Sequence, residues 1–171
     1  MRIPAPIDVG NPAVDMNRKA VMGHSFGGYS VNCVVTQTDS FRAAVSSAGK
    51  SDLLSAYALF HEENGEIDGY GCQLLETGQL KQGGPPWEQA ENYVKNSPIF
   101  YLDRVSTPLL LIGGSEDPIY MPGGMLVGLE RLGKRVRCVV YKGEGHTPCN
   151  WTVANQADAA KRVLAWLREH V

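Results

Sequence analysis

The stretch from Val21 to Ser30, VMGHSFGGYS, constrains the fold most, because it places a serine between two glycines directly after an apolar run. That run, Lys19–Gly23, is continuous rather than alternating, which is typical of a strand buried on both faces. The letters that follow, GGYSVNCVVTQT, predict a helix. In such a strand–turn–helix context the serine is raised at the strand end, and side chains in place of Gly23 and Gly27 would clash. The stretch predicts either a nucleophilic Ser25 or an ordinary glycine turn.

Further apolar runs of the same continuous kind, each ending in glycine, occupy residues 42–49, 108–114 and 136–143. A helix is predicted over 122–134, where Gly133 is a C-terminal stop, and another over 153–171. In the last helix, Val163, Leu167 and Val171 recur every four residues, so one face is apolar. Strands alternating with helices predict an α/β fold: a mostly parallel sheet of about four strands with helices on both faces.

The segment from residue 51 to residue 107 separates the second and third predicted strands and is rich in glycine, proline and aromatic residues. Its part LKQGGPPWEQAENY is turn-rich and then helical. We interpret the segment as an excursion over the strand ends rather than a second domain, a position that often shapes a pocket. A chain of 171 residues can bury one sizeable core, so a single domain over 1–171 is expected.

Composition excludes several classes of partner. The net charge of −2 gives no strong field for nucleic acid or an anionic membrane, and no apolar run approaches the roughly 20 residues of a membrane span. The first residues do not form a secretory signal, so a cytoplasmic location is expected if Met1 is the true start, and the location is otherwise open. No metal site or cofactor is expected, because the cysteines lack zinc spacing; a disulfide stays open among Cys33, Cys72, Cys138 and Cys149.

An acid and a histidine follow the serine on suitable loops. LLLIGGSEDPIYMP places Asp117 just beyond the third predicted strand, with Glu116 as its rival, and VVYKGEGHTPCNW places His146 before the last helix. Taken singly, an acid in a loop usually caps a helix and a loop histidine usually lies at the surface. The chain order Ser25, Asp117, His146 is the order of the α/β-hydrolase triad, which favours catalysis.

These residue types predict a mechanism. His146 would take the proton of the Ser25 hydroxyl and pass it to the leaving group, while Asp117 would orient the imidazole and stabilise its charged form. The backbone N–H of Phe26, at the start of the first helix, would donate to the oxyanion.

Several segments beyond the glycine turn resemble the catalytic domain of the prolyl oligopeptidase family of serine peptidases. They are, in order, VMGHSFGGY, GGPPWE, NSPIFYLDRVSTPLLLIGG and ERLGKRVRCVVYKGEGH, so the resemblance covers the chain from about Asp15 onward. It implies the C-terminal half of an α/β-hydrolase fold, with Ser25 as nucleophile, Asp117 as acid and His146 as base. It also implies a peptide or acyl-peptide substrate and no cofactor. A carboxylesterase on the same fold remains an alternative, because ester and amide cleavage use the same groups.

The specificity pocket departs from the family's pattern. Members commonly carry an aromatic residue after the SD that follows the second strand, where this chain has Leu53. Ile119 and Tyr120 stand two and three positions after the acid, in place of the usual polar and small apolar residues. Tyr57, Phe60 and Tyr120 are candidate wall residues, and core packing is the alternative for each.

The resemblance further implies early strands, an N-terminal propeller and a tyrosine hydroxyl for the oxyanion, all preceding the elbow at Ser25. The residues before Ser25 are too few to form them, so we expect this chain to be an N-terminally truncated piece of a longer hydrolase. A missing N-terminal segment, a partner chain or an oligomer would then cover the first strand, which would otherwise be an exposed edge. A non-catalytic fragment is a further alternative.

Overall fold

The computed structural model of the chain describes residues 15–58, 62–63, 66–67, 70–118, 120 and 122–171. Two of the predicted pocket residues, Phe60 and Ile119, lie outside the described residues.

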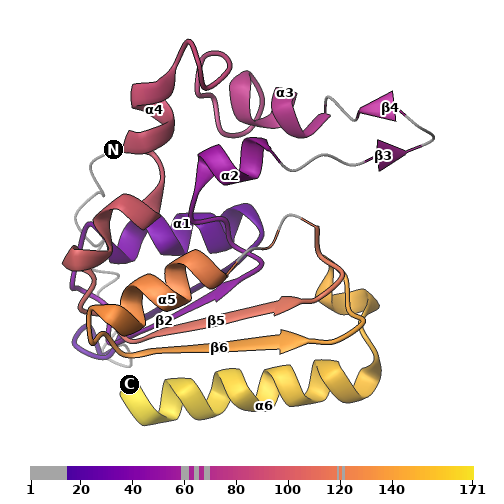
Figure 1. Cartoon of the computed structure of the whole chain (residues 1–171). Helices are drawn as coiled ribbons and strands as arrows, with labels where there is room; N and C mark the ends of the chain where they lie inside the picture. The colour runs from indigo at the N-terminus through magenta and orange to yellow at the C-terminus, as the bar shows by residue number, and fades with distance from the viewer. Residues whose placement is uncertain (1–14, 59–61, 64–65, 68–69, 119, 121) are drawn as a thin grey trace.

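Four strands form one parallel sheet in the order β1-β2-β5-β6 (Figure 1). Their bounds are β1, Ala20–His24; β2, Ala43–Ser47; β5, Leu109–Gly114; and β6, Val136–Tyr141. The predicted α/β fold and its four strands are therefore confirmed. Burial on both faces holds for the central strands β2 and β5, whereas β1 and β6 are partly exposed, because each has a strand on one side only among the described residues.

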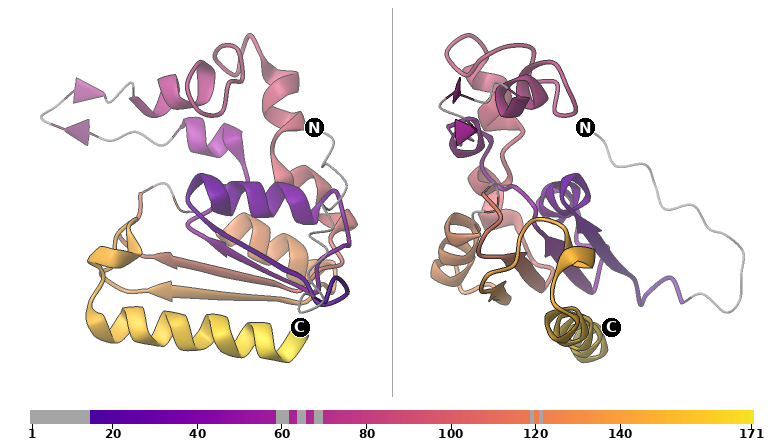
Figure 2. Two further views of the ribbon diagram at one scale, coloured as in Figure 1. Left: turned by 180° about the vertical axis from the view of Figure 1, so that it is seen from behind. Right: turned by 90° about the vertical axis from the view of Figure 1, so that its right-hand side faces the viewer.

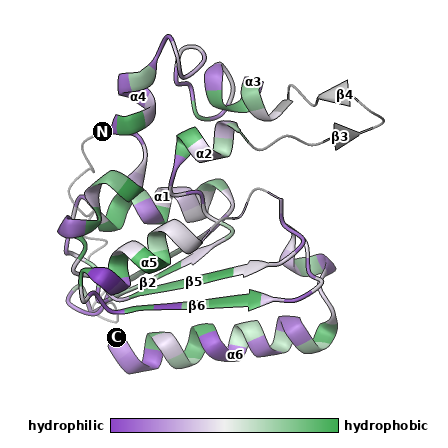
Figure 3. Ribbon diagram, viewed as in Figure 1, coloured by the Kyte–Doolittle hydropathy of each residue, from purple (hydrophilic) through white to green (hydrophobic). Residues whose placement is uncertain are grey.

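Helices cover both faces of the sheet, as the sequence predicts (Figure 2). Helix α1 (Phe26–Val35) and helix α5 (Gly123–Arg131) pack on one face, where Val31, Met125 and Leu129 join the core of β2 and β5. Helix α6 (Val153–His170) packs on the other face through a stripe that includes the buried Trp166. Apolar residues alternate with polar ones along α6 (Figure 3), so only one side of this helix faces the sheet.

The excursion leaves the sheet after β2, returns at β5 and lies beyond α1 (Figure 1). Its elements are α2, Leu53–Tyr57; β3, Glu62–Glu63; β4, Glu66–Ile67; α3, Tyr70–Glu76; α4, Ala90–Lys95; and the 3-10 helix η1, Pro98–Arg104. A small separate core of Leu53, Ala56, Leu75 and Tyr93 holds α2, α3 and α4 together. The excursion is tied to α1 by the Tyr29 hydroxyl, which donates to the carbonyl of Asn96 at 2.7 Å.

The four cysteines are unpaired thiols in this structure. In the parts of the chain that the structure describes, no group of three or more His, Cys, Asp or Glu side chains could hold a metal ion. No helix among the same residues is long and apolar enough to cross a bilayer.

Candidate active site

The strand-to-helix turn at Ser25 is a strained, closely packed elbow. Ser25 has φ 58° and ψ −117°, in the left-handed half of backbone space that residues with a side chain rarely occupy. Its N–H donates to the carbonyl of Ser47 at 2.8 Å, which ties the turn to the end of β2. A Cβ at Gly23 would lie 2.4 Å from the carbonyl carbon of Gly27, so only glycine fits there. The strain is held by backbone packing, and it raises the serine side chain at the strand end.

The second crowded glycine of the elbow is Gly28, not Gly27. A Cβ at Gly28 would lie 2.5 Å from the Ser47 carbonyl oxygen, whereas a Cβ at Gly27 would meet nothing within 4 Å. The prediction that a side chain at Gly27 would clash is therefore wrong. The physical reason is that α1 packs its Gly28 side directly on the end of β2. The GG pair in the sequence was the available signal for this contact.

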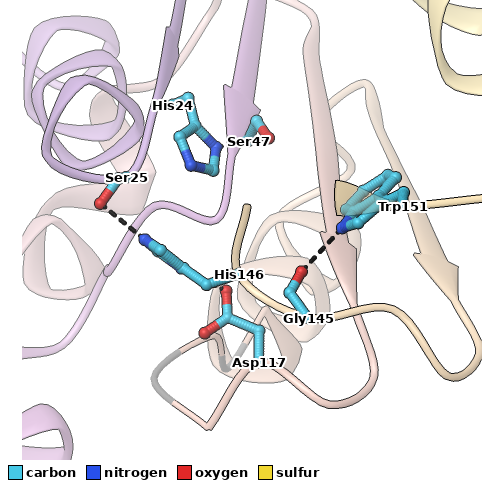
Figure 4. Close-up of polar contacts among 7 residues, drawn as sticks. All are labelled: His24, Ser25, Ser47, Asp117, Gly145, His146 and Trp151. Atoms are coloured by element: carbon cyan, nitrogen blue, oxygen red, sulfur yellow. Dashed lines mark hydrogen bonds and ion pairs between the residues drawn. The ribbon is translucent and has the colours of Figure 1, made fainter. Parts of the chain in front are cut away.

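The structure brings Ser25, His146 and Asp117 together from three separate loops (Figure 4). His146 Nε2 lies 2.8 Å from Ser25 Oγ, and His146 Nδ1 lies 2.7 Å from Asp117 Oδ2. An ionised carboxylate only accepts hydrogen bonds, so the arrangement fits an imidazole whose Nδ1–H donates to Asp117. The bare Nε2 of that tautomer can then accept the serine proton.

Burial differs along this chain of hydrogen bonds. The Asp117 side chain is fully buried, whereas 31% of the His146 side chain is exposed. The rival acid Glu116 points elsewhere, because its carboxylate accepts a hydrogen bond from Ser115 Oγ at 3.1 Å. The carboxylate that lies within hydrogen-bond distance of His146 is therefore that of Asp117, and part of the imidazole is open to solvent.

Two titratable groups beside the site had no role in the sequence interpretation. His24 Nδ1 lies 3.1 Å from Ser47 Oγ, and its ring centroid is 5.0 Å from that of His146. Burial first, and the neighbouring His146 second, lower the pKa of His24, which favours its neutral form. Burial also lowers the pKa of Lys50, although the charge of Asp117 opposes that shift. The position of His24 next to Ser25 was the signal that could have drawn attention to it.

Phe26 is the first residue of α1, so its N–H has no partner within the helix. The helix N-terminus carries partial positive charge at the same place. Its role as an oxyanion donor stays a prediction.

Of the predicted pocket residues that the structure describes, Leu53 and Tyr120 are buried and Tyr57 is partly buried. Leu53 is fully buried in the excursion core. The Tyr57 hydroxyl donates to Glu76 Oε1 at 2.7 Å, and the buried Tyr120 ring lies where a Cβ of Gly113 would be. These placements match the core-packing alternative, and contact with a substrate stays a prediction.

Comparison with known proteins shows to which family this chain belongs. The sequence model of the prolyl oligopeptidase family matches residues 9–171. The chain belongs to the prolyl oligopeptidase family. The resemblance stated from the sequence motifs is therefore confirmed.

The relatives of this prolyl oligopeptidase family chain are peptidases. The peptidase YuxL of Bacillus subtilis is 32% identical over 140 residues, which are 80% of this chain and 20% of that protein. The solved acylaminoacyl peptidase of Pyrococcus horikoshii aligns with a TM-score of 0.75 and 28% identity, over 92% of this chain and 25% of that one. A puromycin-hydrolyzing peptidase of Mycobacterium tuberculosis aligns with a TM-score of 0.76 and 28% identity, over 91% and 22% of the two chains. This chain therefore spans about a fifth to a quarter of the length of these relatives.

Proposed function

We propose that this chain carries the acyl-transfer site of a serine peptidase, with Ser25 as nucleophile, His146 as general base and Asp117 as the residue that orients the imidazole. The observation that carries the proposal is the continuous line of hydrogen bonds, 2.8 Å and 2.7 Å long, that starts at a serine on a strained helix N-terminus.

Each group would act at a stated atom. Ser25 Oγ attacks the substrate carbonyl carbon while its proton moves to His146 Nε2, and the resulting imidazolium is stabilised by Asp117. The Phe26 N–H donates to the oxyanion of the tetrahedral intermediate. The proton on Nε2 then passes to the leaving amine, the C–N bond breaks, and an acyl group remains on Ser25. Water, deprotonated by the same nitrogen, releases the acyl group and restores the serine.

The substrate class we propose is a peptide or an N-acylated peptide. Support comes from family membership and from the likeness to an acylaminoacyl peptidase at 28% identity. An acyl-peptide anilide and a short p-nitrophenyl ester, assayed side by side, test this class. We expect turnover of the anilide that Ser25→Ala abolishes. Turnover of the ester alone, also abolished by Ser25→Ala, would identify an esterase instead, and a folded chain that cleaves neither would favour the non-catalytic alternative.

We also propose that a further polypeptide segment, from a longer chain or a second molecule, pairs with the outer edge of β1 in the working enzyme. Three observations support this. Among the described residues, β1 pairs with β2 alone. Met22 on β1 is 64% exposed. Beside it lies a mostly apolar cavity of about 510 Å³, lined by residues that include His24, Val45 and Trp151. A strand end supplied there would adjoin Ser25 and could carry a second oxyanion donor.

Light scattering and binding of an apolar dye to the purified chain test this pairing. We expect self-association or strong dye binding. A soluble, cooperatively folded monomer that binds no dye would contradict it.

A further inference from the structure

The loop between β6 and α6, residues 142–152, carries His146 and is held by contacts that the proposed chemistry does not itself use. Glu144, two residues before His146, is buried in this loop although it is acidic. Buried acids are rare unless their oxygens are hydrogen-bonded, so Glu144 needs donors within the protein.

The Glu144 carboxylate is bound at the start of α6. Its Oε1 accepts from the Thr152 N–H at 2.9 Å, from Thr152 Oγ1 at 2.9 Å and from Asn155 Nδ2 at 2.6 Å. Thr152 is the N-cap residue of α6, whose first N–H groups have no partner within the helix and favour a negative charge. The hydrogen bond from Asn155, followed by those from Thr152, lowers the pKa of Glu144 despite its burial. The side chain therefore ties the histidine loop to the first turn of α6.

The side chain of Glu144 contacts α6, whereas its backbone carbonyl contacts the loop that carries Asp117. The Glu116 N–H donates to the Glu144 carbonyl oxygen at 2.9 Å, and Glu116 directly precedes Asp117. The approach is so close that a Cβ at Gly114 would lie 1.9 Å from the same oxygen. One residue thus joins the acid loop, the histidine loop and α6.

A second bond holds the residue between Glu144 and His146. The indole Nε1 of Trp151 donates to the Gly145 carbonyl at 2.8 Å (Figure 4). The carbonyl of Trp151 in turn accepts from Gln156 Nε2 on α6 at 2.7 Å. The loop is therefore held at both Glu144 and Gly145, and Glu144 provides the larger set of bonds.

We propose that Glu144 is a positioning residue that fixes His146 against Asp117 by joining the acid loop, the histidine loop and the start of α6. The effect of Glu144 on reactivity rests on the proposed function, whereas its effect on the His146–Asp117 hydrogen bond does not. Glu144 is not a catalytic residue, because its carboxylate binds Thr152 and Asn155 and it acts through His146.

Three variants separate positioning from general stability. Glu144→Ala removes all three bonds to Oε1, whereas Glu144→Gln keeps an oxygen that can accept from the same donors. Asp158→Ala is the matched control, because Asp158 also joins α6 to the sheet, accepting from the Tyr141 hydroxyl at 2.8 Å and from Arg162 Nε at 2.6 Å. It weakens the docking of α6 without removing a bond of the histidine loop.

Inactivation by a fluorophosphonate, resolved into a binding constant and a maximal rate, is the first readout. A catalytic group displaced by about 1 Å loses about 10²-fold in rate, so we expect a loss of about that size in the maximal rate of Glu144→Ala. We expect its binding constant for the reagent to stay unchanged, Glu144→Gln to recover the rate to within several-fold, and Asp158→Ala to react like the parent chain. Equal losses in Glu144→Ala and Asp158→Ala would overturn the proposal.

The proton resonance of His146 Nδ1–H, assigned with His146→Ala, is the second readout and does not depend on reactivity. A hydrogen bond to Asp117 shifts this resonance far downfield. We expect the shifted resonance in the parent chain, in Glu144→Gln and in Asp158→Ala, and its loss in Glu144→Ala. Its retention in Glu144→Ala would overturn the proposal. A parent chain that shows the resonance but does not react with the fluorophosphonate would refute the proposed function and leave the positioning role standing.

Discussion

The elbow at Ser25 and the loop at His146 meet across 2.8 Å, yet they are held in different ways. The elbow depends on backbone packed against backbone, at Gly23 and Gly28, and on a strained serine. The histidine loop depends on hydrogen bonds that the Glu144 carboxylate accepts and that the Trp151 indole donates. A steric contact tolerates no added atom, whereas a network of hydrogen bonds can lose members one at a time. We therefore expect the elbow to fail abruptly and the histidine loop to fail in steps.

The largest change in the labelling rate of Ser25 should come from a substitution in the Asp117–His146–Ser25 hydrogen bonds, which join the two regions. Asp117→Asn keeps the shape of the acid but favours the wrong imidazole tautomer, so we expect Ser25 to react with a fluorophosphonate about 10⁴-fold more slowly. Rates of covalent labelling measure this, with circular dichroism as the control for folding. A loss of less than tenfold in a folded variant would show that Asp117 does not orient His146.

The next largest change should come from a side chain added at a crowded glycine of the elbow. In Gly28→Ala, the new methyl group would lie 2.5 Å from the Ser47 carbonyl oxygen. Forcing atoms into a packed site costs about 1–3 kcal/mol, so we expect a lower midpoint of urea unfolding together with lost labelling. Gly27→Ala, one position away, is the matched control and should behave like the parent. Equal behaviour of the two variants would remove the basis for calling the elbow sterically fixed.

Removing one hydrogen bond from the histidine loop should slow the labelling of Ser25 less, and it tests whether this loop fails in steps. Trp151→Phe keeps an aromatic ring but removes the hydrogen bond to the Gly145 carbonyl. A single hydrogen bond contributes about 0.5–1.5 kcal/mol, so we expect labelling of Ser25 to slow by only a few-fold. Complete loss of labelling in a folded Trp151→Phe chain would contradict stepwise failure.

The smallest effect concerns pH. The pKa of Glu144 lies below its ordinary value of 4.5, chiefly because of the Asn155 hydrogen bond. A lowered acid pKa stabilises the fold above the ordinary value, and that contribution is lost as the pH falls through the lowered pKa. The parent chain should therefore be more stable than Glu144→Gln at neutral pH, and the difference should shrink as the pH falls below 4.5. Urea unfolding of both chains across this range measures the difference, and a gap that widens in acid would contradict the assignment.

The same contrast explains how much could be predicted from the sequence. The four strands were predictable because continuous apolar runs mark buried strands, and the elbow was predictable because its residues are adjacent in the chain. Asp117 and His146 were selected as candidates by their order and their place after strands. In each case the signal lies in the sequence itself, either within a short segment or in the order of residues along the chain.

What the sequence could not predict depends on contacts between distant residues. A side chain would clash at Gly28 and not at the predicted Gly27, because α1 packs its Gly28 side on the end of β2. The role of Glu144 depends on Asn155, eleven positions away and on the next helix. The short helices of the excursion rest on a shared core rather than on strong periodicity, so only a turn-rich and then helical region was predicted there.

We propose above that Ser25, His146 and Asp117 act together, with Ser25 as the nucleophile. Intact-mass analysis after fluorophosphonate treatment, followed by peptide mapping, tests it most directly. We predict one adduct per folded chain, located on Ser25 and absent from His146→Ala. A folded chain with no adduct, or with an adduct on another residue, would show that Ser25 is not an activated nucleophile.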